Sequence, residues 1–266
     1  MIKKKMTSLM RTYRIGLVGS GNVAWHLAQN LEDVGHSIVA VYSATEAHAQ
    51  TLADNLYDAK VLNEPDFRET NVDVLLIAVS DDAIEQVCKL LVLPPDVVIA
   101  HTSGTRPLGV LNALPNPKGV FYPLQTFSKN KHVDIGQVPF CLEFDGDVSE
   151  QILYDLASSV SRNLYNLDSQ QRRVLHISAV FACNFTNHLW RLSQEILSEQ
   201  SIDFEILKPL IQETVAKSMA VGPEKAQTGP AARRDLLTIE QHLLYLQGNP
   251  PLHDLYKLLT ESILRH

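Results

Sequence analysis

The sequence predicts an α/β domain with a doubly wound, mainly parallel sheet, followed by an all-helical domain. Up to Leu167, short apolar runs typical of buried strands alternate with helical stretches, the pattern of a parallel sheet covered by helices. From Ser169 onward the strand-like runs stop and the apolar residues recur at helical spacing. We therefore expect one domain over residues 1–167 and a second over residues 168–266.

The clearest motif lies between the first predicted strand and the first predicted helix. The apolar run at residues 14–18 is followed by Gly19-Ser20-Gly21-Asn22-Val23-Ala24. Gly19 is expected to make a tight turn, and Gly21 to let the backbone approach a pyrophosphate bound at the helix N-terminus. The order strand, glycine turn, helix is typical of Rossmann-type dinucleotide sites. A purely structural turn is the alternative.

The second predicted strand, residues 37–42, bears on the choice of dinucleotide. NAD-type sites usually place an acid at the end of this strand to accept hydrogen bonds from the adenosine ribose. Ser43 and Thr45 stand there instead, and no acid precedes Glu46. Two hydroxyls can donate to a 2′-phosphate that a carboxylate would repel, so we expect NADP. NAD stays the alternative, because no arginine stands at position 44 to clamp that phosphate.

Later strands are expected at residues 72–79, 97–100, 120–123, 138–144 and 164–167. Their carboxyl ends should face the ligand crevice, which places Ala78, Val79 and Ser80 beside the ribose and nicotinamide. Asp81 and Asp82 are expected only to cap the next helix. His101 either hydrogen-bonds to the cofactor or substrate, or makes its hydrogen bonds only within its own loop. Pro139 suits an edge strand.

The helical half contains a segment, residues 174–197, that is apolar or small on nearly every side. Such a helix belongs in the middle of a bundle or in an interface. His176 and Asn184 are polar exceptions that lie on one stripe, eight residues apart. A satisfied core or interface role is the default for His176. Asn184 is the stronger ligand candidate, because a buried amide without a partner is costly.

Further along, Thr228-Gly229-Pro230 is expected to open a helix, with a capping hydroxyl and a first-turn proline. Exposed N–H donors beside two arginines would make an anion site there. Arg233 or Arg234 could bind a substrate carboxylate, with Arg233 taken as the candidate. The alternatives are that either arginine pairs with Asp235 or that the segment is an ordinary helix start.

Composition narrows the class of partner. The net charge of −7 argues against nucleic acid, and no apolar run is long enough to span a bilayer. Residues 1–5 are basic, but no apolar stretch follows them, so we expect no signal peptide. The three cysteines (Cys88, Cys141 and Cys183) lack metal-ligand spacing and are expected to be free and buried, in a reducing cytoplasm. No metal site is expected.

Together these residues resemble a family of two-domain bacterial Rossmann-like proteins described as NADP oxidoreductases of unknown substrate. That family is distantly related to pyrroline-5-carboxylate reductase and to deazaflavin-dependent NADP oxidoreductases. The motifs that carry the resemblance are, in order, Gly19-x-Gly21-x-x-Ala24, Ala78-Val79-Ser80-Asp81-Asp82, His101-Thr102-Ser103-Gly104, Tyr122-Pro123-Leu124, His176 with Asn184, and Thr228-Gly229-Pro230 with Arg233 and Asp235. The resemblance implies an NADP domain, a helical domain similar to the C-terminal domain of 6-phosphogluconate dehydrogenase, and a dimer formed through the helices.

Two positions depart from the relatives. The more distant β-hydroxyacid dehydrogenases have a catalytic lysine four residues before the asparagine that Asn184 would match, and Val180 stands there instead. Their mechanism therefore does not carry over. Tyr122 stands where many members of the closer family have histidine.

We expect a cytoplasmic NADP-dependent oxidoreductase that moves hydride between nicotinamide and a small carbonyl or imine. His176 would act as general acid, since histidine titrates near neutral pH, and Asn184 would orient the substrate. Thr228 and Arg233 would bind its polar end. A non-catalytic NADP-binding sensor or scaffold is the alternative. A methyltransferase using S-adenosylmethionine is disfavoured, because no acid closes the second strand.

Overall fold

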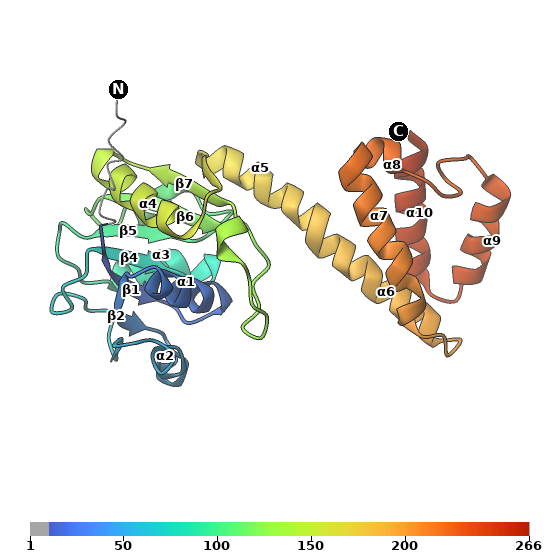
Figure 1. The fold of residues 1–266 in the computed structure, drawn as a ribbon. Helices are drawn as coiled ribbons and strands as arrows, with labels where there is room; N and C mark the ends of the chain where they lie inside the picture. Colours follow the sequence, from blue (N-terminus) through green and yellow to red (C-terminus); the bar gives the residue numbers. More distant parts are fainter. Residues whose placement is uncertain (1–10, 266) are drawn as a thin grey trace, which may run out of the picture. The chain divides into compact units, whose positions relative to one another are not determined.

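The computed structural model describes residues 11–265, which separate into two compact units, residues 11–185 and 186–265 (Figure 1). The basic stretch at residues 1–5 lies outside the described part. The change from strands to helices follows Asn166, close to the position that the sequence indicates. The assignment of cofactor binding to residues 1–167 and of substrate binding to residues 168–266 stays a prediction.

The first unit contains an eight-stranded sheet in the order β3-β2-β1-β4-β5-β6-β7-β8. The strands are β1 (Arg14–Val18), β2 (Ser37–Tyr42), β3 (Lys60–Leu62), β4 (Val74–Ile77), β5 (Val98–His101), β6 (Lys118–Pro123), β7 (Phe140–Phe144) and β8 (Leu164–Asn166). Neighbours from β3 to β6 pair in parallel, β7 runs antiparallel to β6, and β8 is parallel to β7. The predicted mainly parallel sheet is confirmed.

Strand order reverses beside β1, since the chain runs from β1 to β3 on one side and continues from β4 on the other. Ligands of such sheets bind at this switch point, outside the carboxyl ends of the strands. Pro139 lies directly before β7, but β7 is not an edge strand, because β8 pairs with its far side. The edge prediction for this proline is therefore wrong.

Helices cover both faces of the sheet, as predicted (Figure 1). They are α1 (Asn22–Asp33), α2 (Glu46–Ala53), α3 (Ile84–Leu90) and α4 (Asp147–Val160). The next helix, α5 (Ser169–Ala179), follows β8 and runs away from the sheet (Figure 1). One buried cluster joins Leu27 of α1 and Leu153 of α4 to the sheet. A separate cluster on the other face joins Ile84 and Cys88 of α3. The glycine turn and the strand ends are thus held between two packed layers.

No strand follows β8 in the described residues. After α5 come a π-helical turn (Val180–Phe185), α6 (Thr186–Ser198), α7 (Lys208–Val221), α8 (Pro223–Ala226), α9 (Leu236–Leu246) and α10 (Pro250–Arg265). Val174, Ile177 and Phe185 are exposed in the single chain, so burial within a bundle does not account for the apolar segment at 174–197. An interface role for it stays a prediction. Among residues 11–265, no helix has the length and apolar character that a membrane span needs.

Two local expectations are wrong. Thr228-Gly229-Pro230 does not open a helix, because α9 begins only at Leu236, where Asp235 accepts a hydrogen bond from the Thr238 backbone N–H at 3.2 Å. Cys88 and Cys141 are buried and free as expected, but Cys183 is exposed in the π-helical turn.

Candidate cofactor and active site

The glycine turn has the geometry of a tight connection between β1 and α1. Gly19 has a φ of +104°, and its N–H donates to the Tyr42 carbonyl at 2.8 Å. A Cβ at Gly19 would lie 2.5 Å from the Ala78 carbonyl oxygen, so the fold itself requires glycine there. A Cβ at Gly21 would meet nothing within 4 Å. No side chain caps α1 at Gly21, which leaves its first N–H groups available to an anion.

A cavity of about 630 Å³ lies over this turn. Its lining residues are Val18, Gly19, Ser20, Gly21, Tyr42, Ser43, Ala44, His48, Ala78, Val79, Ser80, Ala83, Gln86, Val87, Leu90 and Lys129. Seven of the ten residues predicted to bind cofactor are therefore brought together. None of the described lining residues is acidic, and the Ser20 hydroxyl donates to that of Ser43 at 3.0 Å.

The other three predicted residues (Asn22, Val23 and Thr45) do not line the cavity. The Asn22 side-chain amide donates to the Phe127 carbonyl at 3.1 Å, and Thr45 precedes α2. Two cavity residues that sequence reasoning missed carry basic side chains, His48 and Lys129. Lys129 lies 86 residues beyond Ser43 in the chain, and no local spacing connects the two.

A second polar group joins β6 to α5. The Tyr122 hydroxyl lies 3.1 Å from Nδ1 of His176. Gly104 lies against both, since a Cβ there would be 2.6 Å from that nitrogen and 2.7 Å from Cζ of Tyr122. Burial raises the pKa of Tyr122 to about 12, so its hydroxyl stays protonated at neutral pH. When that hydroxyl donates to Nδ1, a neutral imidazole carries its proton on Nε2.

The loop that contains Gly104 is tied to the end of β4. The Thr105 hydroxyl donates to the Asp81 carboxylate, and Nε of Arg106 donates to the Asp81 carbonyl at 2.8 Å. Arg106 also pairs with the Asp82 carboxylate at 3.2 Å. The prediction that Asp81 and Asp82 only cap a helix is wrong, because neither makes a side-chain cap and both hold this loop.

His101 ends β5 and is completely buried. Its Nδ1 accepts a hydrogen bond from the Ser103 backbone N–H at 3.1 Å. Burial, reinforced by the Arg172 guanidinium, lowers the pKa of His101 to about 3, although the Pro107 carbonyl opposes this. Nδ1 therefore serves the loop, whereas the buried Nε2 makes no hydrogen bond within the described residues. Both alternatives, a role in its own loop and a contact with cofactor or substrate, stay predictions.

Arg172 belongs to a buried network that the sequence analysis missed. Its guanidinium pairs with the Glu143 carboxylate on β7 and donates to the Arg106 carbonyl at 2.5 Å. The Ser169 hydroxyl donates to the same carboxylate at 2.9 Å. Arg172 lies one helical turn before His176, so the network fixes the part of α5 that carries His176. The four-residue spacing of Arg172 and His176 in a predicted helix was the available signal.

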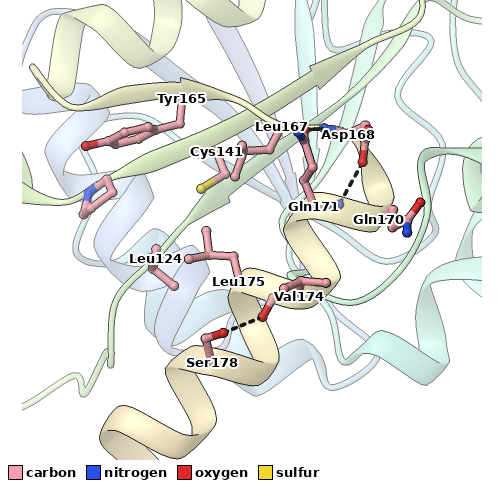
Figure 2. Close-up of a pocket in the computed structure, with 11 residues that line it drawn as sticks. Leu124, Cys141, Tyr165, Leu167, Asp168, Gln170, Gln171, Val174, Leu175 and Ser178 are labelled. Carbon is pink, nitrogen blue, oxygen red and sulfur yellow. Dashed lines mark hydrogen bonds between the residues drawn. The ribbon is translucent and has the colours of Figure 1, made fainter. Parts of the chain in front are cut away.

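A second cavity, of about 720 Å³, lies along α5 and the ends of the last strands (Figure 2). It is lined by Leu124, Pro139, Cys141, Tyr165, Leu167, Asp168, Gln170, Gln171, Val174, Leu175 and Ser178. The cavity is close to the Tyr122–His176 pair. Two of its lining residues show this: Cys141 on β7 lies directly opposite Tyr122 on β6, and Leu175 precedes His176 in α5. Burial raises the pKa of the Cys141 thiol to about 11, which keeps it un-ionised.

The remaining predicted site residues are exposed. Asn184 lies in the π-helical turn, and Thr228 and Arg233 lie in the second unit before α9. Their substrate roles stay predictions. Among residues 11–265, no group of three or more His, Cys, Asp or Glu side chains could hold a metal ion.

Comparisons with known proteins agree with the predicted order of a Rossmann-like domain and a helical region. Residues 3–125 match a Rossmann-like domain, and residues 138–263 match a domain of unknown function, DUF2520. No curated protein matches the sequence. A protein from Bacteroides fragilis, described as a candidate NADP oxidoreductase, is 37% identical with a TM-score of 0.88, and the match covers 96% of this chain and 99% of that one.

Two more distant structures share the fold. A reductive aminase from Aspergillus terreus, solved with NADPH and ethyl levulinate, is 14% identical with a TM-score of 0.71 over 96% of this chain and 94% of that one. A pyrroline-5-carboxylate reductase from Coxiella burnetii is 15% identical with a TM-score of 0.58 over 96% and 97% of the two chains.

Proposed function

This chain belongs to the family of two-domain proteins that join a Rossmann-like domain to a DUF2520 domain, and we propose that it is an NADP-dependent oxidoreductase. The observation that carries the proposal is the acid-free cavity over the glycine turn. The fold gives no steric reason for glycine at position 21, whereas a bound pyrophosphate does. The description of the Bacteroides fragilis relative supports the same activity.

In this proposal the cavity residues hold the dinucleotide and the uncapped N-terminus of α1 binds its pyrophosphate. Bound NADPH supplies the hydride to a small-molecule carbonyl or imine. Ala78, Val79 and Ser80 follow β4 and line the cavity, where they would lie beside the ribose and nicotinamide of the cofactor. Their role would be to orient the cofactor.

The proposed proton donor is His176. With Nδ1 occupied by the Tyr122 hydroxyl, Nε2 carries the proton and passes it to the carbonyl oxygen or imine nitrogen as hydride arrives at the carbon. The product is an alcohol or amine, and water returns a proton to the ring. Asn184, Thr228 and Arg233 are proposed to bind the polar parts of the substrate. The apolar cavity beside Leu175 would hold its hydrocarbon part.

Ligand-induced stabilisation tests the cofactor. NADPH at 100 times its dissociation constant should stabilise the fold by about 2.7 kcal/mol, with a smaller effect of NADH and none of S-adenosylmethionine at equal concentration. The measurement is thermal unfolding with each compound. Stabilisation by S-adenosylmethionine but not NADPH would contradict the proposal.

Single-turnover NADPH oxidation with a panel of ketones, aldehydes and cyclic imines tests the chemistry. His176→Ala should slow hydride transfer by about 100-fold or more, because the developing charge loses its proton donor. His188→Ala, an exposed histidine further along the same helical segment, is the control and should match wild type. Tight NADPH binding without oxidation by any substrate would instead identify a sensor, the alternative that Val180 at the lysine position favours.

A further inference from the structure

The loop between β6 and β7 is fastened to the first turns of α1. The Asn22 amide donates to the Phe127 carbonyl at 3.1 Å, and Nε2 of His26 lies 2.9 Å from the Ser128 carbonyl. The rings of His26 and Phe127 also stack with centroids 4.9 Å apart. Three contacts therefore fix the backbone immediately before Lys129, although the segment belongs to a different part of the chain.

These contacts place Lys129 at the proposed cofactor cavity. Its ammonium lies 4.8 Å from the centroid of the ring of Trp25, the fourth residue of α1. Lys129 lines the same cavity as Ser43, Ala44 and His48, and its side chain is exposed. No other lysine or arginine is among the described residues that line this cavity.

The position in the cavity indicates which phosphate the ammonium meets. In this fold the adenosine ribose lies at the end of β2, and Ser43 and Ala44 occupy that end. The pyrophosphate already has the free N–H groups of α1. A 2′-phosphate adds a further dianion beside Ser43, where a fixed cation would stabilise it by a charge-assisted hydrogen bond.

We propose that Lys129 is the specificity residue for the 2′-phosphate of NADP, delivered by the β6–β7 loop in place of an arginine after β2. The inference rests on the proposed function and adds the residue that distinguishes NADP from NAD. Ser43 donates its hydroxyl to the same phosphate, and His48 on the first turn of α2 adds a second nitrogen donor.

The test is isothermal titration of Lys129→Ala with NADPH and with NADH, which needs no substrate. We expect NADPH affinity to fall by about tenfold or more, the loss of one charge-assisted hydrogen bond, while NADH affinity changes by less than about twofold. Lys129→Arg should keep the preference. Lys131→Ala is the matched control, because Lys131 lies on the same loop, is exposed and does not line the cavity.

The outcomes separate the two claims. Equal losses of NADPH and NADH affinity would place Lys129 at the pyrophosphate and overturn the inference, as would unchanged binding of both. Either result would leave NADP binding by the wild-type protein intact. Wild-type protein that binds neither dinucleotide would refute the proposed function and the inference with it.

Discussion

At the residue scale, the buried histidine at the end of β5 couples the fold to pH. The pKa of His101 is lowered to about 3, whereas an unfolded histidine titrates near about 6.5. Below about pH 6.5 His101 is therefore protonated in the unfolded chain, whereas in the folded chain it stays neutral down to about pH 3. As the pH is lowered through that window, the free energy of unfolding decreases by about 1.4 kcal/mol per pH unit from this one group.

We expect His101→Asn to remove this contribution, because an asparagine oxygen can accept the Ser103 N–H without titrating. Urea unfolding at pH 7 and pH 5 measures it: wild type should lose about 2 kcal/mol more than the variant between the two. Carboxylates and His36, whose pKa burial also lowers, titrate alike in both proteins and cancel. Parallel stability profiles would show that the His101 ring is hydrated in the folded state.

Several residues of the candidate site were predictable because their chemistry follows from a local pattern. Gly19, Gly21 and Ser43 stand at the ends of adjacent strands, where a parallel sheet must bring them together. Lys129 and Tyr122 were not assigned roles, since their partners are 86 and 54 residues away and only the tertiary fold joins them. Asp81 was misread because a carboxylate before a helix resembles a cap in sequence, whereas here it accepts from Thr105.

At the element scale, Arg172 holds α5 on the sheet through a buried ion pair. Replacing it with methionine leaves the Glu143 carboxylate, 16% exposed, without its cation. Breaking a buried pair on one side costs about 3–5 kcal/mol, and the partial exposure of Glu143 favours the lower end of that range. We also expect slower hydride transfer, because α5 carries His176.

A double-mutant cycle checks this reading. Arg172→Met should lower the urea midpoint strongly, and adding Glu143→Gln should recover part of the loss by removing the unpaired charge. Additive losses in the double variant would mean that the two side chains do not interact energetically. Arg173→Met, an exposed neighbour on the same helix, is the control and should change stability little.

Elements with strong local signals were predicted well, and those set by tertiary context were not. The bounds of β2 and α9 agree with the apolar periodicity and the turn residues around them. The antiparallel direction of β7 has no sequence signature, because the apolar run of a buried strand is the same whether the strand pairs in parallel or antiparallel. The π-helical turn at Val180–Phe185 has more residues per turn than an α-helix. His176 and Asn184, which an α-helical period places on one face, are therefore not aligned as that period predicts.

At the scale of the whole molecule, the exposed apolar surface of the helical half remains to be explained. Met219 on α7 is 78% exposed, and Leu237 on α9 and Leu258 on α10 are 68% and 63% exposed. Monomeric proteins rarely expose contiguous apolar patches larger than a few hundred Å². The predicted homodimer through the helical residues would cover such side chains.

We therefore expect sedimentation equilibrium to give twice the 29.7 kDa chain mass. Met219→Glu should shift the distribution toward monomer, since a carboxylate buried in an apolar interface would lose its hydration without gaining a partner. Lys217→Glu, exposed on the same helix, introduces the same acid at a polar position and should leave the mass unchanged. A wild-type protein that stays monomeric at micromolar concentrations would rule out the dimer, and Met219→Glu that stays dimeric would move the interface away from this part of α7.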